Sequence, residues 1–226
     1  MRYKNIKKGI FKERPNRFIA YVEIDGKIEV CHVKNTGRCR ELLIPDAEVY
    51  LEESDNPSRK TKYDLVAVWK NGLLFNIDSQ APNKVFGEWL SATDYFGEIT
   101  HIKPEFQYKS SRLDFYAETK EKKILIEVKG GTLEKEGVLM FPDAPTERGI
   151  KHIKELIGAS TQGYSSAVAF VIQTECAKYF TPNKDTHPEF CRVLKEAQGK
   201  GVEILALCCD VLPDRLSIRE FVPIKL

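Results

Sequence analysis

The segment Ser111–Leu133 constrains the fold of this 226-residue chain more than any other stretch. It consists of two strand-like runs joined by a polar turn, and side chains on a strand alternate between its two faces. In the second run, Glu127 and Lys129 share one face with Leu125, and the β-branched residues between them share the other. In the first run, Asp114 is a charged residue between apolar neighbours. The segment therefore predicts a hairpin in a hydrophobic core that nevertheless carries charged side chains.

The turn predicts which of these charged groups face each other. A hairpin closed at Lys120 and Glu121, or by a loop over Thr119–Lys122, pairs Asp114 directly with Glu127. Directly opposed side chains lie about 4.5–5.5 Å apart at Cβ. Two carboxylates at that separation repel each other unless a cation lies between them, and their oxygens suit Mg²⁺ or Mn²⁺. The hairpin therefore predicts a divalent-metal site.

The neighbours of Glu127 extend this prediction. Lys129 is placed to orient or deprotonate a metal-bound water, or to offset charge on a phosphate. The Gly130–Gly131 pair would let a backbone or a ligand come close. The alternative is that the hairpin simply exposes ordinary mixed charges to solvent. A single Asp and a Glu-x-Lys motif are short and common, so they do not by themselves identify a metal site.

An Asp followed by Glu-x-Lys on a strand resembles the core of the PD-(D/E)XK nucleases. The wider sequence is similar to the sugar fermentation stimulation protein A (SfsA) family, through the blocks HVKNTGR, EVKGGTL and FPDAPTERGIKHIKEL in that order. The resemblance covers nearly the whole chain. It implies that Asp114 and Glu127 bind Mg²⁺ or Mn²⁺, with the Val128 carbonyl as a possible further ligand, and that Lys129 orients the water that attacks a phosphodiester. Two departures stand out: Gly130 where relatives often carry Asn, and Lys34 where they often carry Pro.

The first 80 residues contain five short β-rich runs with tight turns, which predict an OB-like barrel. Asp25-Gly26 and Asn71-Gly72 are hairpin signals, and Asn35-Thr36-Gly37 is a further turn. The predicted strands are Arg17–Ile24, Lys27–Val33, Ala47–Glu53, Tyr63–Lys70 and Leu73–Asp78. OB barrels often bind single-stranded nucleic acid through basic and aromatic side chains.

The charge of the chain is concentrated at its N-terminal end. Residues 1–40 contain 11 Lys and Arg against 4 Asp and Glu, a balance of +7, whereas the whole chain carries +2. Such a segment is typical of phosphate contact, although a solvated segment that aids solubility has the same composition. The candidate DNA-binding residues are Arg14, Arg17, Lys34, Arg38 and Arg40.

Residues 81–226 predict a mixed α/β domain, because helical and apolar β-rich runs alternate after the hairpin. The expected strands are Glu136–Phe141, Ser165–Gln173 and Val202–Cys209, and the expected helices begin at Asn83, Thr146 and Pro188. By the nuclease resemblance, Glu88 on the first helix is a candidate third acidic group. Arg148 and His152 are four residues apart on one helix face, and near a metal site they could hold the scissile phosphate.

The composition excludes several classes of protein. No apolar run approaches the roughly 18 residues of a membrane helix, and the first residues lack the apolar region of a secretory signal. The six cysteines, Cys176 among them, form no CxxC pair, which fits reduced thiols and a cytoplasmic location. No phosphate-binding glycine loop, GxSxG elbow or dinucleotide motif occurs.

Two functions therefore compete. The first is a metal-dependent DNA nuclease. The second, implied by the family resemblance, is a non-catalytic DNA-binding regulator of sugar (maltose) metabolism with little sequence preference. The sequence contains no strong helix-turn-helix signature, which fits non-specific binding through phosphates. It leaves open whether the DNA is single- or double-stranded, and it leaves open the oligomeric state.

Overall fold

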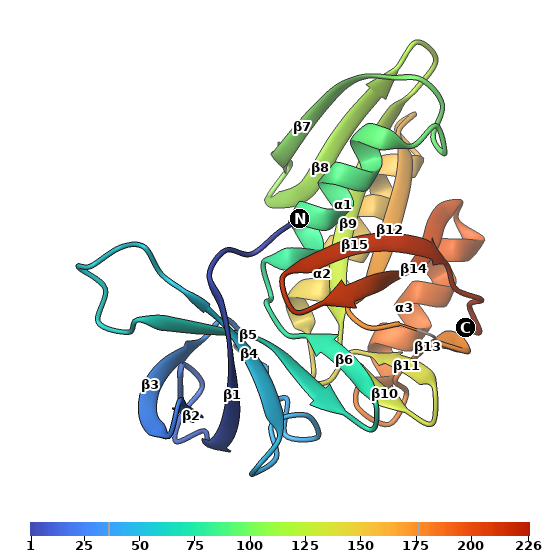
Figure 1. Cartoon of the computed structure of the whole chain (residues 1–226). Helices are drawn as coiled ribbons and strands as arrows, with labels where there is room; N and C mark the ends of the chain where they lie inside the picture. The colour runs from blue at the N-terminus through green and yellow to red at the C-terminus, as the bar shows by residue number, and fades with distance from the viewer. Residues whose placement is uncertain (36, 176) are drawn as a thin grey trace.

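The first five strands close into a barrel, as expected for an OB-like domain (Figure 1). The computed structural model describes residues 1–35, 37–175 and 177–226, so Thr36 of the predicted turn and Cys176 lie outside the described residues. The barrel strands are β1 (Ile6–Glu13), β2 (Ile19–Ile24), β3 (Lys27–Val33), β4 (Glu48–Glu53) and β5 (Tyr63–Lys70). They lie in the order β3-β2-β1-β4-β5, and a parallel pairing of β3 with β5 closes the barrel.

Two details of the predicted barrel were wrong. The strand β1 was not expected, because Lys7, Lys8 and Glu13 face solvent and only Gly9 and Phe11 are buried, so the run lacks an apolar signature. The run at Leu73 forms β6 (Leu73–Asn76), which pairs with β5 outside the closed barrel. From β6 the chain passes directly to the second domain.

Both predicted hairpin turns are confirmed. Asp25 and Gly26 have φ values of 52° and 76°, and Asn71 and Gly72 have φ values of 50° and 78°. Two consecutive left-handed residues are the backbone signature of a tight hairpin turn, and Asn, Asp and Gly adopt this conformation most readily. The two hairpins therefore form where local turn chemistry dictates.

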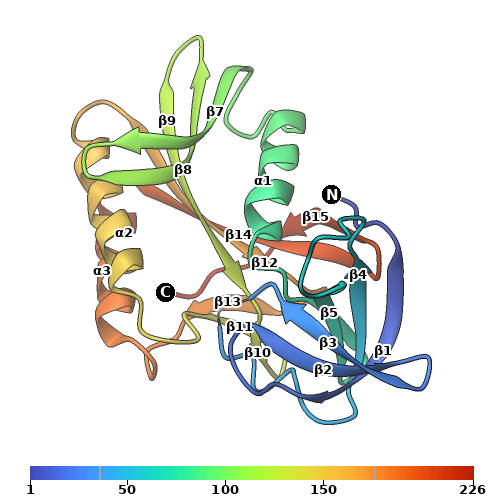
Figure 2. The same ribbon diagram turned by 90° about the vertical axis from the view of Figure 1, so that its left-hand side faces the viewer.

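The second domain is a six-stranded mixed sheet covered by helices on both faces (Figure 2). Its strand order is β15-β14-β12-β9-β8-β7, with β9, β12 and β14 parallel and the other pairs antiparallel. The strands are β7 (Ile99–Tyr108), β8 (Ser111–Thr119), β9 (Lys123–Gly131), β12 (Ser165–Ile172), β14 (Val202–Leu212) and β15 (Arg215–Phe221). A smaller sheet contains β10 (Leu133–Lys135), β11 (Val138–Phe141) and β13 (Tyr179–Pro182).

The helices divide between the two faces of the large sheet. Figure 2 shows α2 (Glu147–Ser160) and α3 (Pro188–Gly199) on one side and α1 (Ala81–Ala92) on the other. The helix α1 begins two residues before the expected Asn83 start, with a Pro in its first turn. The two edge strands β7 and β15 were not predicted, because both contain several exposed residues and lack a continuous apolar run.

The strand β9 lies in the middle of this sheet and confirms the predicted alternation. Leu125 packs in the core under α2 and α3, whereas Ile124 and Ile126 pack in the core under α1. On β8, however, Leu113 and Phe115 face opposite cores, although simple alternation would place them on one face. The pairing of β8 with β9 begins at Phe115, so Leu113 lies beyond the part of β8 that pairs with β9.

No helix among the described residues is long and apolar enough to cross a membrane. Cys31, Cys39, Cys191 and Cys209 are free thiols.

Candidate active site

The β8–β9 hairpin has the register that the turn predicted. Phe115 pairs with Ile126 and Tyr116 pairs with Leu125, and Asp114 and Glu127 lie directly next to the first of these pairs. Asp114 lies close enough to Glu127 for the negative charge of Glu127 to act on it. The two carboxylates are linked through the backbone as well, since the Val128 amide donates to Asp114 Oδ2 at 2.7 Å. The hairpin therefore brings the two predicted metal-binding carboxylates together.

Glu127 is almost fully buried, with 2% of its surface exposed. Its Oε1 atom contacts both the Lys129 ammonium and the His152 Nδ1 atom. Its Oε2 atom is buried and has no hydrogen-bond partner among the described residues. Burial alone would raise the pKa of the Glu127 carboxyl, but the hydrogen bond from His152 and the positive charge of Lys129 outweigh burial and hold the pKa below its ordinary value.

Asp114 is shifted in the opposite direction. Burial, and next the negative charge of Glu127, raises the pKa of the Asp114 carboxyl above its ordinary value. The hydrogen bonds from Val128 and Asn83 and the charge of Lys129 offset only part of this effect. The site therefore holds two neighbouring carboxylates that lack enough positive charge to favour ionisation of both.

His152 lies beneath the carboxylates instead of at the surface. It is 4% exposed, and its contact with Glu127 means that it positions this carboxylate. It therefore does not lie where the predicted direct contact with a phosphate would need it. Arg148, one turn earlier on α2, is exposed, and its Nε atom lies 3.5 Å from His152 Nε2. Arg148 thus remains accessible to a bound phosphate.

Helix α1 contributes Asn83 to the site. The Asn83 side-chain amide donates to Asp114 Oδ1 at 2.7 Å. Glu88, the candidate third acid, is exposed and instead pairs with the Met1 ammonium at 2.6 Å. Asn83 and Glu88 are five residues apart, which puts them on different faces of a helix with 3.6 residues per turn. Sequence reasoning missed Asn83 because an amide in a first helical turn indicates capping.

Two of the predicted DNA-binding residues are engaged within the protein. The Arg14 guanidinium donates to four backbone carbonyls, those of Arg17, Asn35, Gly37 and Arg38, at 2.6–2.9 Å. The Lys34 ammonium pairs with buried Asp78 at 2.8 Å. Arg14 therefore shapes the loop that carries other basic residues, and Lys34 anchors the segment that leads from β6 to α1.

The other three predicted cations remain available. Arg17, Arg38 and Arg40 are exposed, and within residues 1–35, 37–175 and 177–226 their guanidinium groups form no hydrogen bond or ion pair. Arg17 and Arg38 lie on the loops that Arg14 holds. All three arginines are therefore exposed to solvent, and the loops that carry Arg17 and Arg38 are held by Arg14.

The carboxylates offer an incomplete ligand set for a metal. In the part of the chain that the structure describes, no group of three or more His, Cys, Asp or Glu side chains is arranged to hold an ion. Mg²⁺, however, is commonly bound through one or two carboxylates with waters and substrate phosphates completing its shell. The unpartnered Glu127 Oε2 and the raised pKa of Asp114 fit such a cation.

Comparison with known proteins gives matches over the whole chain. A model of the sugar fermentation stimulation protein RE domain matches residues 80–215, and a model of the SfsA N-terminal OB domain matches residues 13–77. A sugar fermentation stimulation protein homolog of Ruminiclostridium cellulolyticum is 57% identical over 226 residues, which is 100% of both chains. The homolog of Clostridium beijerinckii is 56% identical over the same coverage.

A solved structure has the same fold. Pyrococcus furiosus SfsA in complex with Ca²⁺ matches with a TM-score of 0.89 and 30% sequence identity, over 100% of this chain and 98% of that chain.

Proposed function

Because the chain belongs to the sugar fermentation stimulation protein family, we propose that it binds DNA with little sequence preference and hydrolyses phosphodiesters with a divalent cation. The observation that carries this proposal is the pair formed by Asp114 and Glu127, with one buried oxygen of Glu127 left unpartnered. A buried acceptor without a donor costs about 1–3 kcal/mol, and more when it is charged. A cation at this position would remove that cost.

The donor set suits Mg²⁺ or Mn²⁺. Asp114 and Glu127 would hold the cation, and the Val128 carbonyl is a candidate further ligand. The Pyrococcus furiosus relative was solved with Ca²⁺, a cation that also takes oxygen ligands. When bound, such a cation supplies a Lewis acid that stabilises negative charge on phosphoryl oxygens.

Side chains around the two carboxylates would orient the attacking water, hold the carboxylates and bind the phosphate. Lys129 would orient the attacking water, while its contact with Glu127 fixes the ammonium in the site. His152 and Asn83 hold the two carboxylates from opposite faces of the sheet. Arg148 is placed to bind a phosphate oxygen. Attack on phosphorus would break the bond to the 3′ oxygen, giving a 3′ hydroxyl and a 5′ phosphate.

The exposed arginines of the barrel support the DNA-binding part of the proposal. Phosphate contacts dominate non-specific binding, and each contact adds to its salt dependence. Arg17, Arg38 and Arg40 can make such contacts without first breaking an ion pair within the described residues. The protein would bind DNA in the cytoplasm.

The test is cleavage of labelled single-stranded and duplex DNA in Mg²⁺, in Mn²⁺ and in EDTA. We expect metal-dependent cleavage that falls by roughly 10²–10³-fold or more in Lys129→Ala, the range observed when one electrostatic stabiliser is removed. Lys123→Ala is the matched control, because Lys123 lies on the same strand but is exposed at the far end of β9. Undiminished cleavage in Lys129→Ala would contradict the proposal.

A second candidate function is a DNA-binding regulator of sugar metabolism without catalysis. One observation favours it: Glu127 Oε1 is already occupied by Lys129 and His152, so part of the negative charge is compensated within the protein. DNA retention without cleavage, unchanged in Asp114→Ala, would support this function and would leave the carboxylates a structural role.

A further inference from the structure

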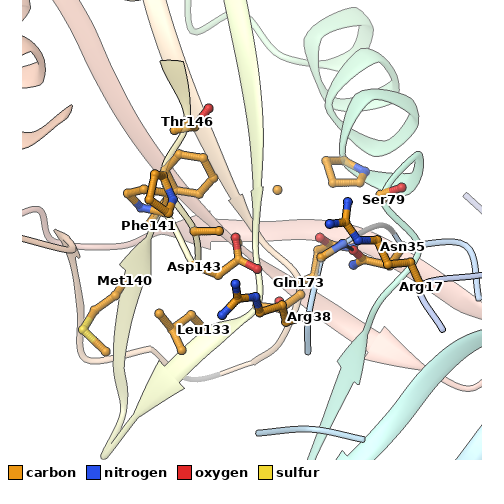
Figure 3. Close-up of a pocket in the computed structure, with 18 residues that line it drawn as sticks. Arg17, Asn35, Arg38, Ser79, Leu133, Met140, Phe141, Asp143, Thr146 and Gln173 are labelled. Atoms are coloured by element: carbon orange, nitrogen blue, oxygen red, sulfur yellow. Dashed lines mark hydrogen bonds between the residues drawn. The ribbon is translucent and has the colours of Figure 1, made fainter. Parts of the chain in front are cut away.

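A cavity of about 450 Å³ lies between the barrel and the α/β domain (Figure 3). We infer that this cavity receives one nucleotide of a single DNA strand and delivers the strand to the Asp114–Glu127 site. The inference rests on the proposed function, and it names the form of DNA that the site takes. Its walls come from both domains: Arg17, Asn35 and Arg38 on the barrel side, and Thr132, Phe141 and Asp143 on the other.

The cavity begins beside the candidate active site. Two of its wall residues, Pro82 and Gly130, are chain neighbours of Asn83 and Lys129. Consecutive Cα atoms are about 3.8 Å apart, so the wall starts one residue from the groups that hold and flank the carboxylates. Pro82 and Gly130 also pack tightly, since a Cβ on Gly130 would lie 2.6 Å from Pro82 Cγ. The wall of the cavity therefore lies directly beside the residues of the site.

The barrel side of the cavity presents positive charge. Arg17 and Arg38 line it, and the same two residues line an adjoining hollow that also includes Arg40. The Arg14 guanidinium holds this loop by donating to the carbonyls of Arg17 and Arg38. Successive phosphates of a bound DNA strand would contact these arginines in turn, and the strand would then reach Lys129.

The other side of the cavity offers groups that suit a base. The ring of Phe141 can stack on a base, and single-strand binding relies on such stacking. Thr132 and Asp143 supply hydrogen-bonding groups for the edges of an unpaired base. Figure 3 shows Asp143, Arg38 and Gln173 near the middle of the cavity. The lining thus combines phosphate and base recognition.

The two domains are fixed to each other across this region, which argues against a duplex. The Asn76 amide donates to the Gln173 carbonyl at 2.9 Å, and the Gln173 side chain donates to Asn76 Oδ1 at 2.9 Å. Asn76 and Gln173 are buried, so the cavity cannot widen without breaking these hydrogen bonds. The cavity volume falls within the roughly 300–1,000 Å³ of sites for small ligands, which suits one nucleotide and excludes paired strands.

The test measures binding in EDTA, so that it does not depend on cleavage. The probes are a labelled single strand of about 12 nucleotides, within the site sizes of OB folds, and the blunt duplex of the same sequence. We expect the single strand to bind at least about ten-fold more tightly than the duplex. Equal binding of both probes would count against the inference.

A filled cavity gives the sharpest variant. Gly131 lines the cavity, and a Cβ built on it meets no atom within 4 Å, so Gly131→Leu would project into open space. We expect this variant to weaken single-strand binding about ten-fold, as steric exclusion of one stacked base predicts. Gly199→Leu is the matched control, because its added Cβ also meets nothing and Gly199 is exposed on α3. Unchanged single-strand binding in Gly131→Leu would overturn the inference.

The arginines provide a second measurement. Replacing both Arg17 and Arg38 by alanine should reduce the magnitude of the slope of log affinity against log salt by about 1.4. Each phosphate contact to single-stranded DNA contributes about 0.7 to that slope. Lys27→Ala with Lys60→Ala removes the same charge from exposed barrel residues that do not line the cavity. An equal loss in both pairs would mean that net charge, and not the cavity, governs binding.

The same probes in Mg²⁺ separate this inference from the proposed function. Lys129-dependent cleavage of duplex DNA that Gly131→Leu does not affect would leave the nuclease intact and overturn the single-strand route. Single-strand binding that Gly131→Leu weakens, without any cleavage, would support the cavity and refute the nuclease.

Discussion

Two buried carboxylates in this protein have opposite surroundings. Asp78, at the junction of the domains, has no exposed surface, and both of its oxygens are satisfied. Its Oδ2 atom pairs with the Lys34 ammonium at 2.8 Å and accepts from the Tyr3 hydroxyl at 3.2 Å. Its Oδ1 atom accepts from the Gln80 amide at 2.9 Å. Glu127 is equally buried, but one of its oxygens has no partner in the described part of the chain.

The difference shows how to distinguish a structural carboxylate from a functional one. Burial of charge is costly unless the charge is paired and hydrogen-bonded, and Asp78 meets both conditions. Glu127 meets them at one oxygen only and has Asp114 as a neighbour of like charge. Such an arrangement is expected where a ligand completes the site. The comparison therefore fits a structural role for Asp78 and the metal-binding role that we propose for Glu127.

The largest effect should come from breaking the satisfied pair. Lys34→Ala leaves Asp78 buried without its cation, and removing one partner of a buried pair costs about 3–5 kcal/mol. We expect urea unfolding to show a loss of this size. Lys62→Ala is the control, because its ion pair with Glu53 is at the surface and should contribute little. A small loss in Lys34→Ala would mean that Asp78 does not depend on Lys34.

The sequence predicted much of the fold for local reasons. Hairpin turns, the central apolar strands and the amphipathic helix α2 all follow from nearest-neighbour chemistry. The strands β1, β7 and β15 were missed because charged and exposed residues hide their periodicity, and their pairing partners decide their structure. Tertiary contacts override such weak local patterns.

The candidate site divides in the same way. The approach of Asp114 to Glu127 follows from one turn, so the sequence alone could predict it. The roles of Asn83, His152 and Glu88 depend on how the helices pack on the sheet. Neither spacing nor residue type reveals that packing. The sequence therefore indicated Glu88 as a third acidic group and did not indicate that Asn83 contacts Asp114.

A smaller effect should come from the unsatisfied pair, with opposite signs for its two members. The folded-state pKa of the Asp114 carboxyl is raised, so its contribution to the free energy of unfolding falls as pH rises from the unfolded-state pKa to the folded-state pKa. The negative charge of Asp114 is therefore unfavourable at neutral pH. Asp114→Asn should therefore increase the free energy of unfolding, by about 1 kcal/mol or a rise of about 2–4 °C in the midpoint.

Glu127→Gln should act in the other direction. The folded-state pKa of Glu127 is lowered, so its charge stabilises the protein above the unfolded-state pKa, and this stability is lost as pH falls. Calorimetry of both variants at neutral pH without metal tests the contrast. Destabilisation by Asp114→Asn would show that its hydrogen bonds outweigh the repulsion, and the two carboxylates would no longer differ in the proposed way.

The smallest effect concerns the pH at which the site accepts a cation. Metal binding needs deprotonated ligands, so Mn²⁺ should raise the melting temperature less as pH falls through the raised pKa of Asp114. The hydrogen bond from Asn83 lowers this pKa, so Asn83→Ala should move the loss of the Mn²⁺ effect to higher pH. Glu88→Gln should leave it in place, because Glu88 pairs with Met1 and not with Asp114. A shift in Glu88→Gln and none in Asn83→Ala would restore Glu88 as the helix residue that acts on the metal, and Asn83 would lose its role.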